Sequence, residues 1–172
     1  MANVVAKLVR SLVGHHPYCA LIGVGYGSLV REFLVGRCPA IFVLGVDDHG
    51  AEPGWLPEGS KTLYDLMDSE TRAEAKRKAG IAFRGRVEYR GHKRAEFVEQ
   101  SPFRGPRRQD LRGYNFIYLD YDRSPTGHWL LAGRWLAALT PKGVMRGRTD
   151  ECQAGAKAFG EQYALQIHWE GR

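Results

Sequence analysis

Short apolar runs alternate with helix-like patterns along the first part of the chain. Residues 19–22 form a run of small and aliphatic side chains that stops at the glycine-rich stretch 23–27. Apolar residues then recur at helical spacing over 29–34, up to Gly36. The pattern predicts a buried parallel strand that leads through a glycine turn into a helix. Such a turn leaves backbone N–H groups at a helix N-terminus and has no side chains that keep a ligand away.

A second apolar run, residues 40–46, is too short for a buried helix and ends in Asp47 and Asp48. It predicts a second strand beside the first. A carboxylate at the end of the second strand of such a unit can accept hydrogen bonds from both hydroxyls of a ribose. Glycines at strand-to-helix turns often serve packing alone, but the acid after the second strand favours a nucleoside-bearing cofactor.

The middle of the chain has weaker patterns. Ser60 can cap a helix over 60–67, and a second helix over 69–79 is expected to end at Gly80. Residues 87–89 are expected to form the third strand, and residues 95–100 one or two helical turns.

The next pair of elements has clear boundaries. Residues 115–119 predict a fourth strand, closed by Asp120. Ser124 followed by Pro125 is a strong helix start, because serine caps the first turn and proline fits the first helical position. The turn 140–143 is expected to end this helix.

Three further elements are predicted: a strand from Val144, a helix over 153–163 and a strand over 164–169. Strands that alternate with helices predict an α/β fold with a doubly wound, mostly parallel sheet and helices on both faces, a Rossmann-like arrangement. We expect a single domain over 1–172, with an N-terminal helix and linker (1–17), a cofactor-binding core (18–150) and a final helix and strand (151–172).

Composition supports a globular domain. The chain has 172 residues, of which 44% are hydrophobic and 11% aromatic. No apolar run is long enough to span a membrane, and residues 1–16 lack the features of a signal peptide, so we expect a cytoplasmic protein with no membrane partner. The three cysteines are far apart and form no C-x-x-C pair, which argues against a disulfide framework or a zinc site.

Positive charge is concentrated in one segment. The formal net charge is +6, and between Arg84 and Arg112 nine lysines and arginines stand beside four acidic residues. Two interpretations stay open: a solvated loop, or a basic lip that binds an anionic partner, either a phosphorylated or carboxylated small molecule or RNA. Few aromatic side chains are present for base stacking, so a nucleic-acid partner is the less favoured of these.

The predicted topology brings the candidate residues together. Ligands of doubly wound sheets bind beyond the carboxyl ends of the strands, where we expect the glycine turn, Asp47, His92 and Asp120 to meet. The glycine spacing is G-x-G-x-G and not G-x-G-x-x-G. It therefore favours S-adenosylmethionine over a nicotinamide cofactor.

Several stretches of the chain resemble class I S-adenosylmethionine-dependent methyltransferases, in particular the small branch known as methyltransferase family 24. Residues 21–28 (LIGVGYGS) resemble its cofactor-binding turn, and residues 45–50 (GVDDHG) the end of its second strand. Residues 116–127 (FIYLDYDRSPTG) resemble its aspartate-rich fourth-strand pattern, and 139–143 (LTPKG) and 62–65 (TLYD) also agree in order and spacing.

The resemblance implies that S-adenosylmethionine is the cofactor and S-adenosylhomocysteine its product. The implied contacts are with the methionine part through Gly23, Val24, Gly25, Tyr26 and Gly27, the ribose through Asp47 and Asp48, the adenine through His92, and the reacting end through Asp120.

Three departures from the family pattern carry expectations of their own. Leu21 stands where the family usually has an acid that receives the cofactor's amino group. Arg148 and Thr149 replace a His-Asp pair, so half of the carboxylates that hold magnesium in some relatives is missing and a metal site is doubtful. One predicted strand follows the last helix, where the family has a hairpin, so the fold is expected to be minimal or shortened at its C-terminus.

The predicted function is methyl transfer to a small, anionic acceptor. An oxygen acceptor would need a base, for which Asp122 together with Asp120 is the first candidate and His128 or His92 the weaker ones. Each of these residues also has a non-catalytic interpretation. Asp122 fits a turn carboxylate at the start of a helix equally well, and His128 is better interpreted as an exposed residue in the first turn of that helix. The alternatives are a cofactor-binding protein of the same fold without transfer activity, and an RNA methyltransferase or RNA-binding protein that uses the basic segment 84–112.

Overall fold

Five parallel strands form one central sheet in the computed structural model, which describes residues 7, 9–11, 13–14, 16–35, 40–51, 56–84, 88–89, 92–111 and 113–147. The strands are β1 (Tyr18–Ile22), β2 (Phe42–Asp47), β5 (Ala95–Glu99), β6 (Tyr114–Leu119) and β7 (Leu139–Gly147). Their order in the sheet is β5-β2-β1-β6-β7, and each neighbouring pair is parallel. The predicted α/β fold with a doubly wound, Rossmann-like sheet is therefore confirmed.

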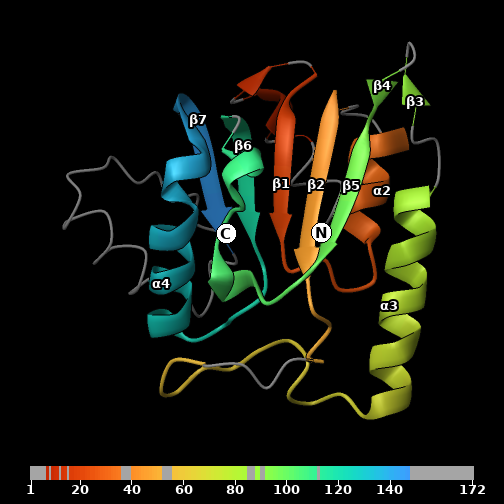
Figure 1. Cartoon of the computed structure of the whole chain (residues 1–172), viewed down its shortest axis with the longest axis vertical. Helices are drawn as coiled ribbons and strands as arrows, with labels where there is room; N and C mark the ends of the chain where they lie inside the picture. Colours follow the sequence, from red (N-terminus) through yellow and green to blue (C-terminus); the bar gives the residue numbers. More distant parts are fainter. Residues whose placement is uncertain are drawn as a thin grey trace.

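The central strand β1 marks the point where the strand order reverses. The chain adds β2 and β5 on one side of β1 and then returns to add β6 and β7 on the other. Figure 1 shows the arrowheads of all five strands directed toward one edge of the sheet, with the yellow segment that follows β2 running below that edge. Open α/β sheets bind their ligands at this edge, next to the point of reversal.

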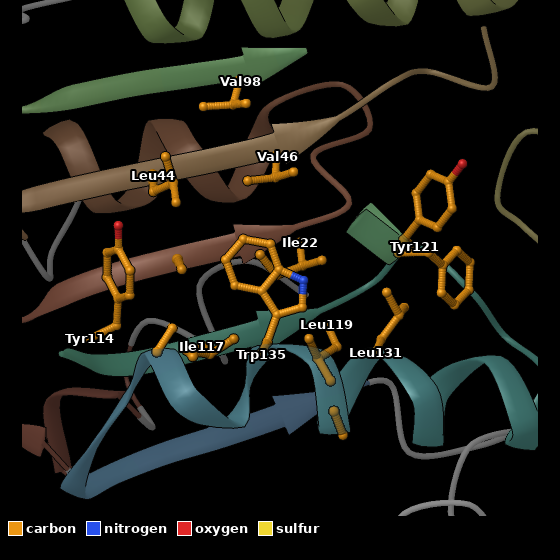
Figure 2. Close-up of a cluster of buried hydrophobic side chains, with 14 of the residues drawn as sticks. Ile22, Leu44, Val46, Val98, Tyr114, Ile117, Leu119, Tyr121, Leu131 and Trp135 are labelled. Atoms are coloured by element: carbon orange, nitrogen blue, oxygen red, sulfur yellow. The ribbon is translucent and has the colours of Figure 1, made fainter. Parts of the chain in front are cut away.

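Helices cover both faces of the sheet. They are α2 (Ser28–Val35), α3 (Ser69–Arg84) and α4 (Pro125–Trp135), with short 3-10 helices η1 (Pro102–Arg104), η2 (Arg108–Asp110) and η3 (Leu136–Ala138). Side chains alternate along β1, so that Leu21 joins α2 and α3 in one buried cluster and Ile22 joins α4 in another. Figure 2 shows Trp135 of α4 lying against the sheet in the second cluster, with Tyr114 and Tyr121 toward its two ends.

Several predicted elements are found where the sequence placed them. β1, α2, β2 and β6 match their predicted positions, and Val30, Phe33 and Leu34 bury the predicted face of α2. Ser124 caps α4 by accepting a hydrogen bond from the Gly127 amide at 3.0 Å, with proline at the start of the helix. The described residues between 7 and 13 are helical, as expected for the N-terminal segment.

The third strand of the sheet was predicted in the wrong place. It is β5, over residues predicted as helical turns, whereas 88–89 form β3 (Glu88–Tyr89), which pairs in antiparallel fashion with β4 (His92–Lys93) in a separate two-stranded sheet. The alternation of buried and half-buried positions in β5 is weak because this strand lies at the edge of the sheet. Pairing with β2 decides its conformation.

Three other boundaries also differ from the prediction. Residues 60–67 form turns with a single bridging residue, Thr62, and no helix. α3 continues through Gly80 to Arg84. β7 begins at Leu139, so Pro141 lies inside an edge strand, a position that tolerates the missing N–H donor, and the register with β6 shifts beside it.

Part of the sequence-based prediction lies outside the described residues. This holds for the helix over 153–163, the strand over 164–169, and two of the three cysteines. Cys19 is buried in β1, in keeping with its expected place in a buried strand.

Candidate functional site

The carboxylate of Asp47 closes the glycine turn at the carboxyl edge of the sheet. Its Oδ2 accepts hydrogen bonds from the amides of Val24 at 2.5 Å and Gly25 at 3.0 Å, and Oδ1 accepts one from the amide of His49 at 2.8 Å. Asp47 is fully buried. The two predicted parts of the cofactor site, glycine turn and acid, are thus in direct contact.

The glycines of this turn allow close approach of other parts of the chain. A Cβ at Gly23 would lie 2.6 Å from the carbonyl carbon of Asp120, and a Cβ at Gly27 would lie 2.9 Å from Cβ of Ala82 in α3. Both residues also have a positive φ, which disfavours any side chain. Packing within the chain therefore requires glycine at both positions, independently of any ligand.

Asp47 and the next residue, Asp48, each accept a hydrogen bond from a tyrosine hydroxyl. The hydroxyl of Tyr121 donates to Asp48 at 2.8 and 3.0 Å, and the Gly50 amide donates at 2.8 Å. On Asp47, the hydroxyl of Tyr64 donates to Oδ2 at 2.6 Å. Each of the two acids at the carboxyl end of β2 is therefore paired with one buried tyrosine hydroxyl.

Both tyrosines stay protonated at ordinary pH. Burial, followed by the nearby carboxylates, raises the pKa of Tyr64 and of Tyr121 well above the usual value. The two rings lie 6.2 Å apart, and the ring of His49 lies 5.6 Å from that of Tyr64. These aromatic side chains fill the space beyond the ends of β1 and β2.

Residues 60–67, which we call the strap, cross the edge of the sheet and pair with the segment after β6. The Leu63 amide donates to the Tyr121 carbonyl at 3.2 Å, and the Arg123 amide donates to the Lys61 carbonyl at 2.8 Å. Thr62 and Asp122 form an isolated antiparallel bridge. The strap thereby places Tyr64 over Asp47.

Asp122 lies at the start of α4. Its Oδ1 accepts hydrogen bonds from the Ser124 amide at 2.7 Å and the Ser124 hydroxyl at 2.6 Å, and the residue is buried. A Cβ at Gly127 would lie 2.2 Å from the Asp122 carboxyl carbon. The sequence left two interpretations of Asp122 open, a catalytic base and a turn carboxylate at the start of a helix. These contacts are those of the turn carboxylate.

His128 is buried, whereas an exposed position was expected. Only 4% of its surface is accessible, and Nδ1 meets no hydrogen-bond partner in the described part of the chain. Burial lowers its pKa to about 4, although the nearby Asp122 acts in the opposite direction. The imidazole is therefore neutral at pH 7, and a Cβ at Gly147 would overlap its ring.

Asp120 occupies the expected place at the end of β6. Its amide donates to the Ile22 carbonyl at 2.7 Å, which ties the ends of β6 and β1 together. It is half-buried, whereas Asp47, Asp48 and Asp122 are all buried. Tyr26, at the tip of the glycine turn, is 38% exposed and its ring lies 5.5 Å from the Lys78 ammonium group.

The position expected for His92 is wrong. β4 precedes β5, and β5 begins where the Val43 amide bonds the Arg94 carbonyl, at the amino end of β2. His92 therefore lies at the edge of the sheet opposite to Asp47, and Glu99 is the β5 residue that pairs with Asp47. The error follows from the misplaced third strand. Figure 1 shows β3 and β4 at the end of the molecule away from the strand arrowheads.

Sequence reasoning did not identify Tyr64, Tyr121 or His49 as parts of the site. Tyr64 and Tyr121 do stand inside the stretches 62–65 and 116–127 that resemble the methyltransferases, which was the available signal. The contacts that give them a role join residues far apart in the sequence.

Some basic residues of the segment 84–112 form contacts within the protein. Arg107 donates to Asp110 at 2.7 Å and to Glu96 at 2.8 Å, and these carboxylates raise its pKa. Arg94 is buried and donates to the Ala40 carbonyl at 2.7 Å. The rings of Phe83 and Phe103 are buried as well. Fewer charges and rings are thus available to a nucleic acid than the sequence suggests.

In the described part of the chain, no three His, Cys, Asp or Glu side chains gather closely enough to hold a metal ion. Arg148 and Thr149 lie outside it, so the doubt about a metal site stays a prediction. Among the helices within the described ranges, none is both long and apolar enough to cross a membrane.

Comparisons with known proteins add a distant structural likeness. No family model matches the chain. No curated protein matches it either. Among solved structures, it is similar to a possible exported protein from Bordetella parapertussis, with 15% sequence identity and a TM-score of 0.47. The match covers 84% of this chain and 40% of that protein, so the chain spans well under half of its length.

Proposed function

We propose that the protein is an S-adenosylmethionine-dependent methyltransferase that acts on a small, anionic acceptor. The observation that carries the proposal is the contact between the glycine turn after β1 and the Asp47 carboxylate at the end of β2. This contact lies where the strand order of a parallel sheet reverses. Sheets of this kind bind nucleoside cofactors at that place.

The residues present suit a nucleoside in one specific respect. Asp47 and Asp48 each accept a hydrogen bond from a hydroxyl group of this chain, and the ribose of the cofactor offers two hydroxyl groups to the same kind of acceptor. Asp47 and Asp48 would hold the ribose, and the amides of residues 23–27 would border the methionine part. The bound cofactor supplies an electrophilic methyl group.

The chain's own part in catalysis is to position the acceptor and to take up a proton where the acceptor is an oxygen. Asp120 is the better candidate for this role because it is half-buried, whereas Asp122 is buried and already bonded to Ser124. Exposed basic residues of the segment 84–112, such as Arg104 and Arg108, would attract an anionic acceptor.

A second candidate function is a binding protein of this fold without transfer activity. It is favoured by Leu21, which is buried in the core and offers no carboxylate to the cofactor's amino group. An Asp120→Asn variant separates the two candidates once an acceptor is known. Loss of methyl transfer with unchanged cofactor affinity supports the enzyme, and parent protein that binds the cofactor but transfers no methyl group supports the binding protein.

The first experiment is mass spectrometry of small molecules released from the purified protein, followed by calorimetry with S-adenosylhomocysteine. We expect retained S-adenosylhomocysteine or saturable binding. The control is Glu58→Gln, a charge change at an exposed turn position, which should leave binding unchanged. Absence of binding at millimolar ligand, both in the parent and in Tyr64→Phe, which removes the hydroxyl bound to Asp47, would refute the proposal.

A further inference from the structure

The hydroxyl of Tyr64 lies on Asp47 in the way that a ribose hydroxyl would. It donates to Oδ2 at 2.6 Å, and Tyr64 is only 1% exposed. The same oxygen also accepts hydrogen bonds from the amides of Val24 and Gly25. Three donors already share this oxygen, which is more than its two lone pairs serve separately. A further hydroxyl can therefore bond there only if one of these donors leaves.

Of these three donors, only Tyr64 belongs to the strap, whose turn is closed by hydrogen bonds between its own residues. Inside the strap, Asp65 accepts hydrogen bonds from the Thr62 amide at 2.6 Å and the Thr62 hydroxyl at 2.9 Å. This turn stays closed if the strap shifts, because both partners belong to it. The amides of Val24 and Gly25, in contrast, belong to the turn between β1 and α2, and moving them would disturb the sheet.

Few polar contacts hold the strap against the rest of the molecule. Among the described residues they are the Tyr64 hydroxyl, two backbone bonds to residues 121–123, a contact of 3.5 Å from the Lys61 amide to the Asp122 carboxylate, and Arg72 of α3. Arg72 donates to the carbonyl of Met67, the last residue of the strap, at 3.0 Å and to the Gly50 carbonyl at 3.5 Å. Its apolar contacts come from Tyr64, Leu63 and Met67, which pack in or against the core cluster. Leu66 adds none, because it is 95% exposed.

We propose that Tyr64 is a built-in occupant of the ribose site, and that the strap must withdraw it from Asp47 before a nucleoside cofactor binds. This inference rests on the proposed function and specifies how access to the same site is regulated. The free protein then keeps Asp47 paired, and the cofactor competes with a hydroxyl of the chain itself. Its affinity is lowered by the stability of the closed strap.

The test compares the parent with Tyr64→Phe, which keeps the buried ring and removes the competing hydroxyl. We expect Tyr64→Phe to bind S-adenosylhomocysteine roughly tenfold to a hundredfold more tightly, the range that corresponds to one hydrogen bond to a charged group. The matched control is Tyr114→Phe, the same change in the same buried cluster at the amino end of β6. It should leave the affinity unchanged.

A second measurement needs only the parent protein and so does not depend on the folding of a variant. Hydrogen exchange of the Leu63 amide, which bonds the Tyr121 carbonyl in the closed strap, should become faster when S-adenosylhomocysteine is added. Amides in the middle of α3 should not change, because that helix does not move with the strap.

The outcomes separate this inference from the proposed function. If the parent binds S-adenosylhomocysteine, Tyr64→Phe binds it no more tightly, and the Leu63 amide stays protected, the inference is overturned and the proposed function stands. If neither protein binds it, both are overturned. Binding by Tyr64→Phe alone would support both, since the closed strap then excludes the ligand from the parent.

Discussion

The hydroxyl of Tyr121 donates to both carboxylate oxygens of Asp48, at 2.8 and 3.0 Å, across 73 residues of sequence. Together with the bond between Tyr64 and Asp47, it closes the edge of the sheet where a cofactor is expected. The acids at this edge therefore serve the fold as well as any ligand, and this dual role determines what their substitution does.

Substitution of Asp47 tests both roles. Asp47→Ala should lower the free energy of unfolding by at least about 2 kcal/mol, because the amides of Val24, Gly25 and His49 lose a buried acceptor. It should also weaken S-adenosylmethionine binding by roughly 1.5–3 kcal/mol. Urea unfolding and calorimetry measure the two effects. The control Glu58→Ala removes an exposed carboxylate, and equal stability of both variants would contradict the structural role of Asp47.

Two glycines in helices should respond in opposite directions to the same change. Gly127→Ala places a Cβ 2.2 Å from the Asp122 carboxyl carbon and should destabilise the protein by about 1–3 kcal/mol. At Gly80 in α3, the nearest atom to an added Cβ is the end of the Arg84 side chain at 3.7 Å. Gly80→Ala should therefore stabilise by about 0.5–1 kcal/mol. Denaturant midpoints of both variants check this, and a stable Gly127→Ala would show that Asp122 is free to move.

Buried His128 should make stability depend on pH. The unfolded chain takes up its proton near pH 6.5 and the folded protein only near pH 4. The contribution of His128 to the free energy of unfolding is then fully present above pH 6.5. It is lost as the pH is lowered toward 4, by about 3 kcal/mol in total at about 1.4 kcal/mol per pH unit. His128→Gln should remove this part of the slope. Unfolding free energies at several pH values test it, and identical slopes for parent and variant would contradict the assignment.

RNA binding is expected to be weak. Arg94 and Arg107 of the basic segment are held by the fold, so we expect no RNA binding tighter than about 10⁻⁶ M at physiological salt, the non-specific range. Titrations with mixed-sequence RNA at two salt concentrations measure it. Tight binding that is lost in an Arg104→Glu, Arg108→Glu double variant would favour the RNA alternative. These two positions are exposed, and Arg107 is left in place because its reversal would disturb Asp110.

Methyl transfer should survive a chelator once an acceptor is known, because Arg148 and Thr149 offer no carboxylate to a magnesium ion. Activity is measured with and without EDTA. Loss of activity in EDTA that is restored by magnesium would overturn this expectation, and Asp120, Asp122 and Asp150 would then be tested as ligands.

The sequence by itself was sufficient for the elements whose signals are local. β1, the glycine turn, α2 and β2 are bounded by residues that end an apolar run within a few positions. The start of α4 is equally local, since Ser124 bonds Gly127, three residues away. Apolar runs of this length, alternating with helices, also determine that the sheet is parallel and buried, because both of its faces need covering.

Only the tertiary structure decided the third strand and the state of the site. β5 is an edge strand whose half-polar pattern does not by itself indicate a strand, and its pairing with β2 decides its conformation. Because this strand was misplaced, His92 was predicted at the wrong edge of the sheet. Asp47 and Asp48 were found from the sequence, but their partners Tyr64 and Tyr121 were not. A hydrogen bond between side chains far apart in the sequence leaves no periodic pattern, because its geometry is set by how the strap crosses the ends of the strands and not by the residues on either side of it.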